Sequence, residues 1–354
     1  MKNSVHQFVS SISPRDAVGN IVIATRDVLR GAGYTSEIFA ESVHEEMKDE
    51  AKHFTKYNKK NSKDILVYHH SFESSLVDYL LPLKNKIILI YHNITPSHFF
   101  IGLDDSTIKG SVQGRKQLDT IRTRVEVGIA FSKYSEEELK RNGFKNTVVM
   151  PPIFNLNNSY TTKNNAAIYK DNDYTNILSV GRIVPHKKVE DILKIFSYYN
   201  KCINNKSRLH IVGKYETASL YYRWLQNIVS FLELENVNFL TDVSNEELMS
   251  YYKNADLYLS MSEHEGFCLP LLESMYHGVP ILAYAAAAIP ETLGNSGILV
   301  KEKKFAEIAE IIHLIMEDHN LRDKIVKSQL ERLKALDLKF AASQLLNCLD
   351  RLEG

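Results

Sequence analysis

Two successive series of short apolar runs, alternating with helical patterns, constrain the fold of this 354-residue chain more than any other feature. In the first half, the apolar runs are separated by helical stretches such as Ala17 to Arg30 and Ser135 to Arg141. This alternation is typical of βα units with a parallel sheet, whose ligands bind beyond the carboxyl ends of the strands. The strand candidates of this half are Val5 to Val9, Ser36 to Ala40, Ile65 to Tyr68, Ile87 to Tyr91, Val127 to Phe131 and Thr147 to Met150.

A second alternating series begins at Asn176, after a segment of different composition. Residues 151–175 are rich in Asn, Thr and Pro and show little periodicity, which is typical of an interdomain linker. The sequence therefore predicts an α/β chain of two parallel-sheet domains, residues 1–165 and residues 166–337. The strand candidates of the second domain are Ile177 to Val180, Leu209 to Val212, Val237 to Leu240, Asp256 to Ser260 and Gly297 to Val300.

The composition argues against several classes of protein. The chain has three cysteines, odd in number and widely spaced, so neither a disulfide framework nor a zinc site is expected. Its first residues lack the apolar core of a signal peptide, and no apolar run reaches the length of a membrane span. We therefore expect a cytoplasmic protein.

The formal net charge is zero, but the charge is unevenly distributed. Residues 1–170 carry 23 Lys and Arg against 18 Asp and Glu, a net +5, and the other residues carry 20 against 25, a net −5. A basic first half allows peripheral association with the inner face of a membrane or with a lipid diphosphate, and ordinary surface variation explains it equally well. Nucleic acid is not expected as a partner, because no basic stripe is interleaved with aromatic residues.

The stretch from Asn254 to Tyr284 carries the clearest chemistry of the chain. It contains a short apolar strand, a polar turn and a helix that we expect to begin at Pro270 and to end at Gly278. The backbone N–H groups just ahead of this helix then point into the space beside Glu265, where they form an anion site. These groups belong to Gly266, Phe267, Cys268 and Leu269.

Two carboxylates flank this anion site, Glu265 in the turn and Glu273 about one turn inside the helix. A ligand with both phosphate and hydroxyl groups, such as a nucleotide-sugar, suits both kinds of protein group. The alternative is that both glutamates only stabilise the helix N-terminus electrostatically. A second predicted strand exit offers Arg182 and Lys187 as phosphate ligands, with ordinary solvated charges as the alternative.

These two segments resemble those of a known family. The string SEHEGFCLPLLESMYHGVPILAY resembles the E-x7-E segment of family 4 glycosyltransferases, which are retaining enzymes with the GT-B fold of two Rossmann-like domains facing a central cleft. The loop with Arg182 and Lys187 resembles the phosphate-binding loop of that family, although Lys188 stands where glycine is more usual. The resemblance implies a nucleoside-diphosphate sugar as donor, and a last helix, residues 338–354, that crosses back onto the first domain.

The resemblance also implies roles for residues of the second domain. The diphosphate charge is expected to be stabilised by protein groups, in place of a metal ion. Glu265 is expected at a sugar hydroxyl near the reacting carbon, and Glu273 at the ribose hydroxyls. The groups expected at the diphosphate and base are Arg182, Lys187, Gly266, Phe267, Cys268, Leu269, Thr241 and Val243.

Residues of the first domain come from loops after three of its strands. His92 occupies the position where the family places a histidine that reaches the donor sugar, and His70, in a predicted loop from Tyr68 to Ser71, is a candidate on the acceptor side. Asp16 is a further acceptor-side candidate. Gly19 is a candidate for the donor diphosphate, although the family usually carries a pair of glycines in this loop.

Two metal sites are considered and not favoured. His69, His70 and His92 could approach one another, but no H-x-x-x-H pair or cysteine cluster supports zinc. Asp171-Asn172-Asp173 matches the D-x-D pattern of another class of glycosyltransferases, but it lies in the linker with no strand before it. We therefore expect neither a metal ion nor another cofactor.

The function that the resemblance implies is that of a retaining glycosyltransferase of bacterial surface-polysaccharide assembly. It would move a hexosyl unit from a nucleoside-diphosphate sugar, with GDP-mannose as the donor considered, to a glycan or a lipid-linked acceptor. Two alternatives stay open: a non-catalytic GT-B partner module and a nucleotide-sugar epimerase of related fold. A dehydrogenase is not favoured, because the fingerprint G-x-G-x-x-G is absent after the first strand.

Overall fold

The computed structural model describes residues 3–156 and 173–353, which group into two compact units. Unit 1 comprises Met1–Ile101, Asp105–Asn155 and Leu336–Gly354, and unit 2 comprises Gly102–Asp104 and Leu156–Ala335. The domain boundary predicted between residues 165 and 166 lies outside the described residues, as do Asp171 and Asn172.

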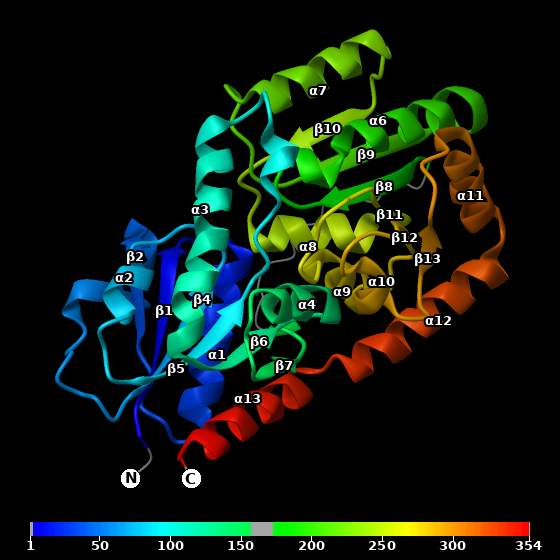
Figure 1. Ribbon diagram of the computed structural model, residues 1–354. Coiled ribbons are helices and arrows are strands. Elements are labelled where there is room, and N and C mark those ends of the chain that lie inside the picture. The colour runs from blue at the N-terminus through cyan, green and yellow to red at the C-terminus, as the bar shows by residue number, and fades with distance from the viewer. Residues whose placement is uncertain (1–2, 157–172, 354) are drawn as a thin grey trace. The chain divides into compact units, whose positions relative to one another are not determined.

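Unit 1 is built on a seven-stranded parallel sheet with the order β3-β2-β1-β4-β5-β6-β7 (Figure 1). Six of these strands match the runs predicted from the sequence, and the three-residue edge strand β3 was not predicted. The strands are β1 (Val5–Ile12), β2 (Ile38–Val43), β3 (Ala51–His53), β4 (Ile65–His70), β5 (Lys86–Tyr91), β6 (Val125–Ala130) and β7 (Thr147–Val149).

Helices cover both faces of this sheet. On one face, α2 (Leu76–Leu80), α3 (Asp105–Ile121) and α4 (Lys133–Arg141) bury residues such as Leu80 and Leu118 against β4 and β5. On the other face, α1 (Ala17–Gly31) packs Val22 against β1 and β2. The last helix, α13 (Leu338–Glu353), belongs to this unit and contacts α1, and its final turn accepts hydrogen bonds from Tyr34 and Lys86.

Unit 2 has a six-stranded parallel sheet with the order β10-β9-β8-β11-β12-β13. With the sheet of unit 1, it confirms the prediction of two parallel-sheet, Rossmann-like domains. The strands are β8 (Thr175–Val180), β9 (Ser207–Val212), β10 (Val237–Leu240), β11 (Leu257–Ser260), β12 (Ile281–Tyr284) and β13 (Ile298–Val300).

Two layers of helices cover the sheet of unit 2 (Figure 1). One layer consists of α6 (Val189–Tyr198), α7 (Leu220–Phe231) and α11 (Phe305–Glu317). The other contains α8 (Asn245–Asn254), α9 (Leu269–Tyr276) and α10 (Ile289–Leu293), with α12 (His319–Ala335) packed against α9. Among the described residues, no helix is both long enough and apolar enough to cross a membrane.

The strand order places the ligand-binding edge of each unit. In unit 2, the chain proceeds from β8 to β9 on one side and from β11 to β12 on the other, so the loops after the neighbouring strands β8 and β11 diverge. Ligands of open parallel sheets bind in the crevice at such a switch point. In unit 1, the corresponding pair is β1 and β4.

A glycine permits the close approach of two strand exits at the edge of unit 2. The N–H of Gly181 donates to Val212, and the N–H of Gly213 donates to Leu240, so the ends of β8, β9 and β10 are bound in a row. A methyl group on Gly213 would lie 2.0 Å from the carbonyl oxygen of Gly181. Gly213 therefore lets the β8 exit, with its two predicted phosphate ligands, lie against the β9 exit.

Candidate functional site

Helix α9 presents an uncapped N-terminus at the switch point of unit 2. It spans Leu269–Tyr276, within two residues of the predicted bounds, and Gly278 follows it with φ +67°. Cys268 precedes the helix in the left-handed region, with φ 75°, and no side chain caps the first turn. A non-glycine residue is uncommon in that region and marks a tight local turn. The first-turn N–H groups are therefore not satisfied by a side-chain cap, as expected of an anion site.

The two exits at this switch point are joined by an ion pair. Lys187, which follows β8, places Nζ 2.5 Å from Oε1 of Glu265, which follows β11. The exposed fractions of the two side chains are 19% and 10%, so water screens the pair little. Burial disfavours the ammonium, but the charge of Glu265 and its hydrogen bond to Lys187 outweigh this effect, and the pKa of Lys187 is raised. The structure thus brings two predicted catalytic residues into direct contact.

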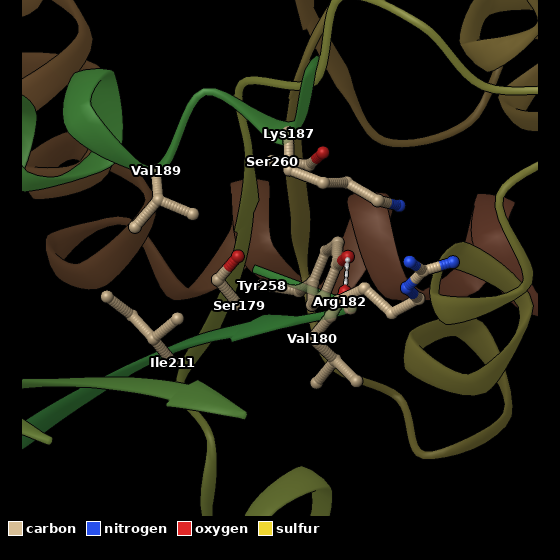
Figure 2. A pocket seen from close by; sticks show the side chains of 9 residues that line it. Ser179, Val180, Arg182, Lys187, Val189, Ile211, Tyr258 and Ser260 are labelled. Atoms are coloured by element: carbon tan, nitrogen blue, oxygen red, sulfur yellow. Dashed lines mark hydrogen bonds between the residues drawn. The ribbon is translucent and has the colours of Figure 1, made fainter. Parts of the chain in front are cut away.

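Arg182 differs from Lys187 in its surroundings. Its side chain is exposed, and no hydrogen-bond partner of its guanidinium lies in the part of the chain that the structure describes. Figure 2 shows Arg182 and Lys187 at a small hollow between the exits of β8 and β11, where the hydroxyl of Tyr258 donates to the carbonyl of Val180 at 3.3 Å. In the same loop, burial lowers the pKa of His186, and the neighbouring Lys187, His264 and Arg182 lower it further.

Glu273, the second glutamate of the E-x7-E segment, is oriented by a neighbouring helix. Its Oε2 accepts a 2.6 Å hydrogen bond from the hydroxyl of Tyr252 on α8. Glu273 is buried on the inner side of α9, and the ring of Tyr252 also stacks on His277 at 5.4 Å. The carboxylate is therefore fixed in direction before any ligand binds.

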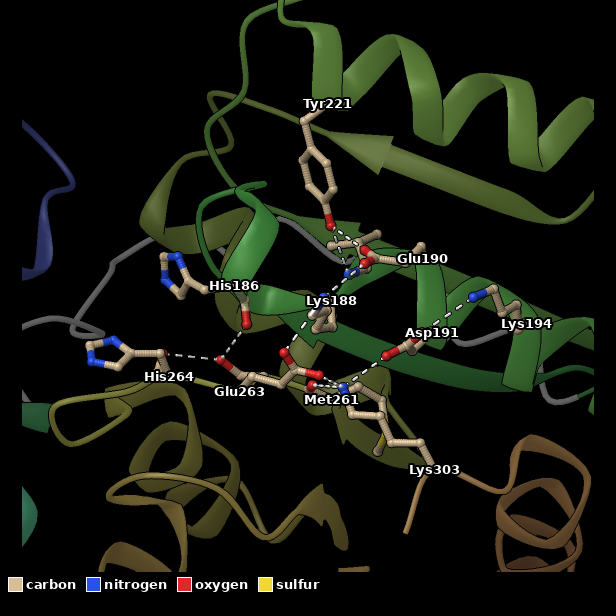
Figure 3. Close-up of polar contacts among 12 residues, drawn as sticks. His186, Lys188, Glu190, Asp191, Lys194, Tyr221, Met261, Glu263, His264 and Lys303 are labelled. Atoms are coloured by element: carbon tan, nitrogen blue, oxygen red, sulfur yellow. Dashed lines mark hydrogen bonds and ion pairs between the residues drawn. The ribbon is translucent and has the colours of Figure 1, made fainter. Parts of the chain in front are cut away.

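A network of charged side chains supports the turn that holds Glu265 (Figure 3). Lys303, which follows β13, donates to Glu263 at 2.6 Å, to Asp191 at 2.8 Å and to the carbonyl of Met261 at 3.2 Å. Lys188 lies 3.5 Å from Glu263 and adopts a left-handed conformation with φ 53°. The network ties the β11 exit to α6 and the β13 exit.

Sequence reasoning did not find this network. Glu263 lies in the stretch from Asn254 to Tyr284, but no pattern in the sequence predicts a role for it. Lys303 lies in a run of charged residues, Lys301 to Lys304, that is typical of a solvated surface. The one local signal is Lys188, because a lysine replaces the glycine that the left-handed position favours.

The remaining donor-side candidates lie along the same edge of unit 2. Phe267 is buried, and its carbonyl accepts a hydrogen bond from Thr292 of α10 at 2.5 Å, which ties the turn to the next helix. Gly266 and Leu269 flank Phe267 and Cys268 in that turn. Thr241 and Val243 follow β10, on either side of Asp242 in a left-handed conformation.

The histidines of unit 1 are placed differently from the prediction. His69 and His70 are the last two residues of β4, fully buried, and not part of an exit loop. His70 contacts the carbonyl of Gly114 at 2.8 Å through Nε2 and the hydroxyl of Tyr68 at 2.8 Å through Nδ1. Both of its ring nitrogens are therefore used within the protein, so the acceptor-side role assigned to His70 is not supported. The hydrogen bond between His70 and Gly114 instead holds α3 against β4.

His92 follows β5 and is partly exposed. Its Nε2 lies 3.0 Å from Nδ1 of His69, and its ring meets Phe131 edge-on at 5.2 Å. Desolvation and His70 lower the pKa of His92 to about 3, so the ring is neutral at physiological pH. His92 is thus a neutral imidazole that His69 and Phe131 hold in place. It lies at the carboxyl end of β5, where ligands of a parallel sheet are expected to bind.

The loop after β1 also differs from its predicted role. Asp16 is the N-cap of α1, and its Oδ2 accepts a 2.9 Å hydrogen bond from the N–H of Gly19. The carboxylate thereby occupies the helix N-terminus, where it disfavours a second anion. The structure therefore gives Asp16 a capping role and takes the Gly19 N–H away from a phosphate.

Metal ligation is limited by these contacts. His69 and His70 use both ring nitrogens within the protein, and His92 uses one of its two. Over residues 3–156 and 173–353, no group of three or more His, Cys, Asp or Glu side chains has an arrangement that could hold a metal ion. Of the D-x-D pattern, only Asp173 lies within those ranges.

The chain resembles proteins of one family. Residues 161–332 match the family model of glycosyl transferases group 1. An uncharacterized glycosyltransferase of Methanocaldococcus jannaschii is 26% identical over 264 residues, which cover 73% of this chain and 67% of that relative. The O-antigen chain mannosyltransferase B of Escherichia coli is 23% identical over 176 residues, which cover 48% of this chain and 44% of that protein. These matches confirm the predicted class of enzyme, a glycosyltransferase, and the family match lies in residues 161–332.

A solved structure agrees on the fold. Anabaena HepE, in complex with UDP-glucose, matches with a TM-score of 0.77 at 16% identity, over 98% of this chain and 99% of that one. At this identity the likeness concerns the fold alone. The GT-B prediction is confirmed in that both halves of the chain are Rossmann-like.

Removing the charge of Lys187 should destabilise the protein, because it leaves Glu265 buried without its counter-ion. We expect Lys187→Met to lower the free energy of unfolding in urea by about 3 kcal/mol. The exposed Arg182 supplies the control, and Arg182→Ala should change stability by less than about 0.5 kcal/mol. The double variant Lys187→Met with Glu265→Gln should regain most of the loss. Equal effects of the two single variants would show that the ion pair is not buried as described.

Acid should destabilise unit 1 through its buried histidines. Burial lowers the pKa of His70 to about 4, that of His92 to about 3, and that of His69 well below its usual value. The unfolded chain binds these protons near pH 6.5 and the folded chain does not, so stability is lost as the pH falls below 6.5. These three histidines together should contribute a slope of up to about 4 kcal/mol per pH unit. His6, His186, His210 and His277, whose pKa values are also lowered by burial, add to it in the same direction.

The measurement is urea unfolding followed by circular dichroism between pH 7 and 5.5. His92→Gln should reduce the slope by about 1.4 kcal/mol per pH unit, and replacement of the exposed His53 should leave it unchanged. A slope that is flat in this range would contradict the neutral, buried state of these rings.

Proposed function

We propose that this chain, whose residues 161–332 match the group 1 glycosyl transferases, is a retaining glycosyltransferase of family 4 type. It moves a hexosyl unit from a nucleoside-diphosphate sugar to a glycan or a lipid-linked acceptor. The observation that carries this proposal is the Lys187–Glu265 contact, which joins the cationic loop and the E-x7-E turn beside the uncapped N-terminus of α9.

The donor diphosphate is proposed to bind between the exits of β8 and β11. Arg182 offers a planar guanidinium that has no partner within residues 3–156 and 173–353, suited to a bidentate contact with phosphate oxygens. The N–H groups at the start of α9, which no side chain caps, and the positive end of the α9 dipole favour the same anion. Lys187 then stabilises the charge that grows on the leaving diphosphate, so its pairing with Glu265 keeps the ammonium in place until a donor binds.

The hydroxyl groups of the donor are proposed to bind the two glutamates. Glu273, oriented by Tyr252, accepts from the ribose hydroxyls, and Glu265 accepts from a sugar hydroxyl near the reacting carbon. Ionised carboxylates form the stronger, charge-assisted kind of hydrogen bond with such donors. His92, a neutral imidazole, is proposed to contact a hydroxyl of the sugar substrate.

Two nucleotide-sugars are the candidate donors. A UDP-sugar is supported by HepE, which was solved with UDP-glucose, and GDP-mannose by the mannosyl transfer named for the E. coli relative. Both donors share the diphosphate that the loops after β8 and β11 would bind. The diphosphate is therefore the part of the donor that we propose. Binding measurements with several nucleotide-sugars identify the base and the sugar.

The remaining parts of the proposal concern partners and surroundings. Protein groups stabilise the leaving diphosphate, so no metal ion takes part in the transfer. The acceptor is proposed to approach from the basic N-terminal half, which favours an anionic or lipid-diphosphate carrier and a peripheral position at the inner face of a membrane. Assembly of a surface polysaccharide in the cytoplasm is the setting that suits these properties.

A thermal-shift panel of UDP-, GDP- and ADP-sugars tests the donor-binding part of this function. A donor at a hundred times its Kd stabilises the folded chain by about 2.7 kcal/mol, so the true donor should raise the melting temperature most. Glu273→Gln keeps an acceptor for Tyr252 but removes the charge, and it should weaken donor binding by roughly 1.5 to 3 kcal/mol. The exposed Glu310 on α11 supplies the control, Glu310→Gln, which should bind as the wild type does. No shift with any donor would reject the function.

The stereochemistry of the product tests the retaining mechanism. An inverting enzyme needs a general base on the acceptor side, whereas the cations and carboxylates here all serve the donor side. During front-face attack, an oxygen of the leaving phosphate can then take the proton from the hydroxyl group of the acceptor substrate. Proton NMR of the first glycoside formed from an α-linked donor should show an α linkage. A β linkage would reject retention and would make His92 a candidate base.

A further inference from the structure

A row of hydrogen bonds runs through the core of unit 1 and ends at His92. The side-chain amide of Gln7, on β1, donates through Nε2 to the carbonyl of Val22 on α1 at 3.0 Å. Oε1 of the same amide lies 2.9 Å from Nε2 of His69, on the neighbouring strand β4. Nδ1 of His69 lies 3.0 Å from Nε2 of His92. Gln7 and His69 are both fully buried, so water does not compete for these contacts.

The direction of every hydrogen bond in this row is fixed by its first member. A backbone carbonyl only accepts, so the amide nitrogen of Gln7 faces Val22 and the amide oxygen faces His69. That oxygen only accepts, so His69 carries its proton on Nε2, and its Nδ1 is an acceptor. Nδ1 of His69 therefore receives the Nε2–H of His92. A neutral imidazole holds one proton, so Nδ1 of His92 bears a lone pair.

The end of the row faces outward from the core. His92 is partly exposed, and no protein partner of its Nδ1 lies in the described ranges of the chain. Hydrogen bonds hold the loop in place. The backbone N–H of His92 donates to the carbonyl of His70 at 2.9 Å, and the side-chain amide of Asn93 donates to the hydroxyl of Ser135 at 2.8 Å. The N–H of Ile94 donates to the hydroxyl of Tyr91 at 3.0 Å. The lone pair of Nδ1 is thus presented in a fixed direction.

We propose that Gln7 and His69 are positioning residues that fix His92 as its Nε2–H tautomer, so that Nδ1 accepts a hydrogen bond from a hydroxyl of the sugar substrate. The substrate part of this inference rests on the proposed glycosyltransferase function. Sugars present many hydroxyl donors, and an acceptor of fixed direction selects one of them. A protonated His92, or its Nδ1–H tautomer, would present an N–H donor at the same place.

The tautomer can be measured without any substrate. Two-bond correlation of ring protons with ¹⁵N distinguishes protonated from unprotonated ring nitrogens, and the His92→Gln spectrum assigns the His92 signals. In the wild-type protein at pH 7, His92 should be protonated on Nε2 and unprotonated on Nδ1. Protonation of Nδ1 instead would overturn the proposal, whatever the activity of the protein proves to be.

Variants test the roles of Gln7 and His69. Gln7→Leu removes the acceptor for the Nε2–H of His69, so His69 should move its proton to Nδ1 and His92 should become the Nδ1–H tautomer. In His69→Gln, the amide nitrogen can donate to Gln7 and the amide oxygen can accept from His92, so the tautomer should be kept. Gln113→Leu, on the exposed side of α3, is the control for the change of residue type. An unchanged His92 tautomer in folded Gln7→Leu would overturn the role of Gln7.

Turnover provides the second readout. Gln7→Leu should lower kcat/KM for the donor sugar roughly tenfold, as expected for one misdirected hydrogen bond, and leave the affinity for the nucleoside diphosphate alone unchanged. His69→Gln should restore most of this loss. Equal losses in Gln7→Leu and His69→Gln would overturn the tautomer account. If no nucleotide-sugar binds to the wild type, the proposed function fails, and the NMR result still decides the tautomer.

Discussion

The buried ion pair between Lys187 and Glu265 is the contact on which the rest of the proposed donor site depends. A charge of either sign alone would be costly at this depth, whereas the pair satisfies both at 2.5 Å. Because the partners follow β8 and β11, their contact joins the two loops at the switch point of unit 2. Lys303 and Asp191 brace the Glu265 turn from the other side. The pair thus fixes in place the groups that a diphosphate would need.

Much of the fold could be predicted from the sequence, because local patterns carry it. Long apolar strands such as β5 and the helix α9, with its proline and glycine signals, came out within one or two residues. The edge strand β3, Ala51–His53, was missed because three residues, two of them exposed, carry no apolar period. His70 was assigned to a loop because a histidine pair reads as polar, although burial and two hydrogen bonds keep it in the strand.

The sequence predicts which residues belong to the candidate site, but it does not predict the contacts between them. The spacing of Glu265 and Glu273 pointed to a nucleotide-sugar site, yet nothing local shows that Glu265 pairs with Lys187, 78 positions earlier. Asp16 reads as a ligand from its loop and proves to be a helix cap, since N-caps and exposed carboxylates look alike in a sequence. The row from Gln7 to His92 joins β1, β4 and the loop after β5, so only the folded chain reveals it.

Hydrogen–deuterium exchange with a bound nucleoside diphosphate tests the central claim, that the loops after β8 and β11 hold the donor diphosphate. The measurement compares peptide segments with and without saturating UDP or GDP. Residues 181–188 and 262–273 should exchange more slowly in the complex, while α7, on a covering layer of the same unit, should be unchanged. Saturated binding that leaves both loops unprotected, with protection elsewhere, would contradict this account of the site.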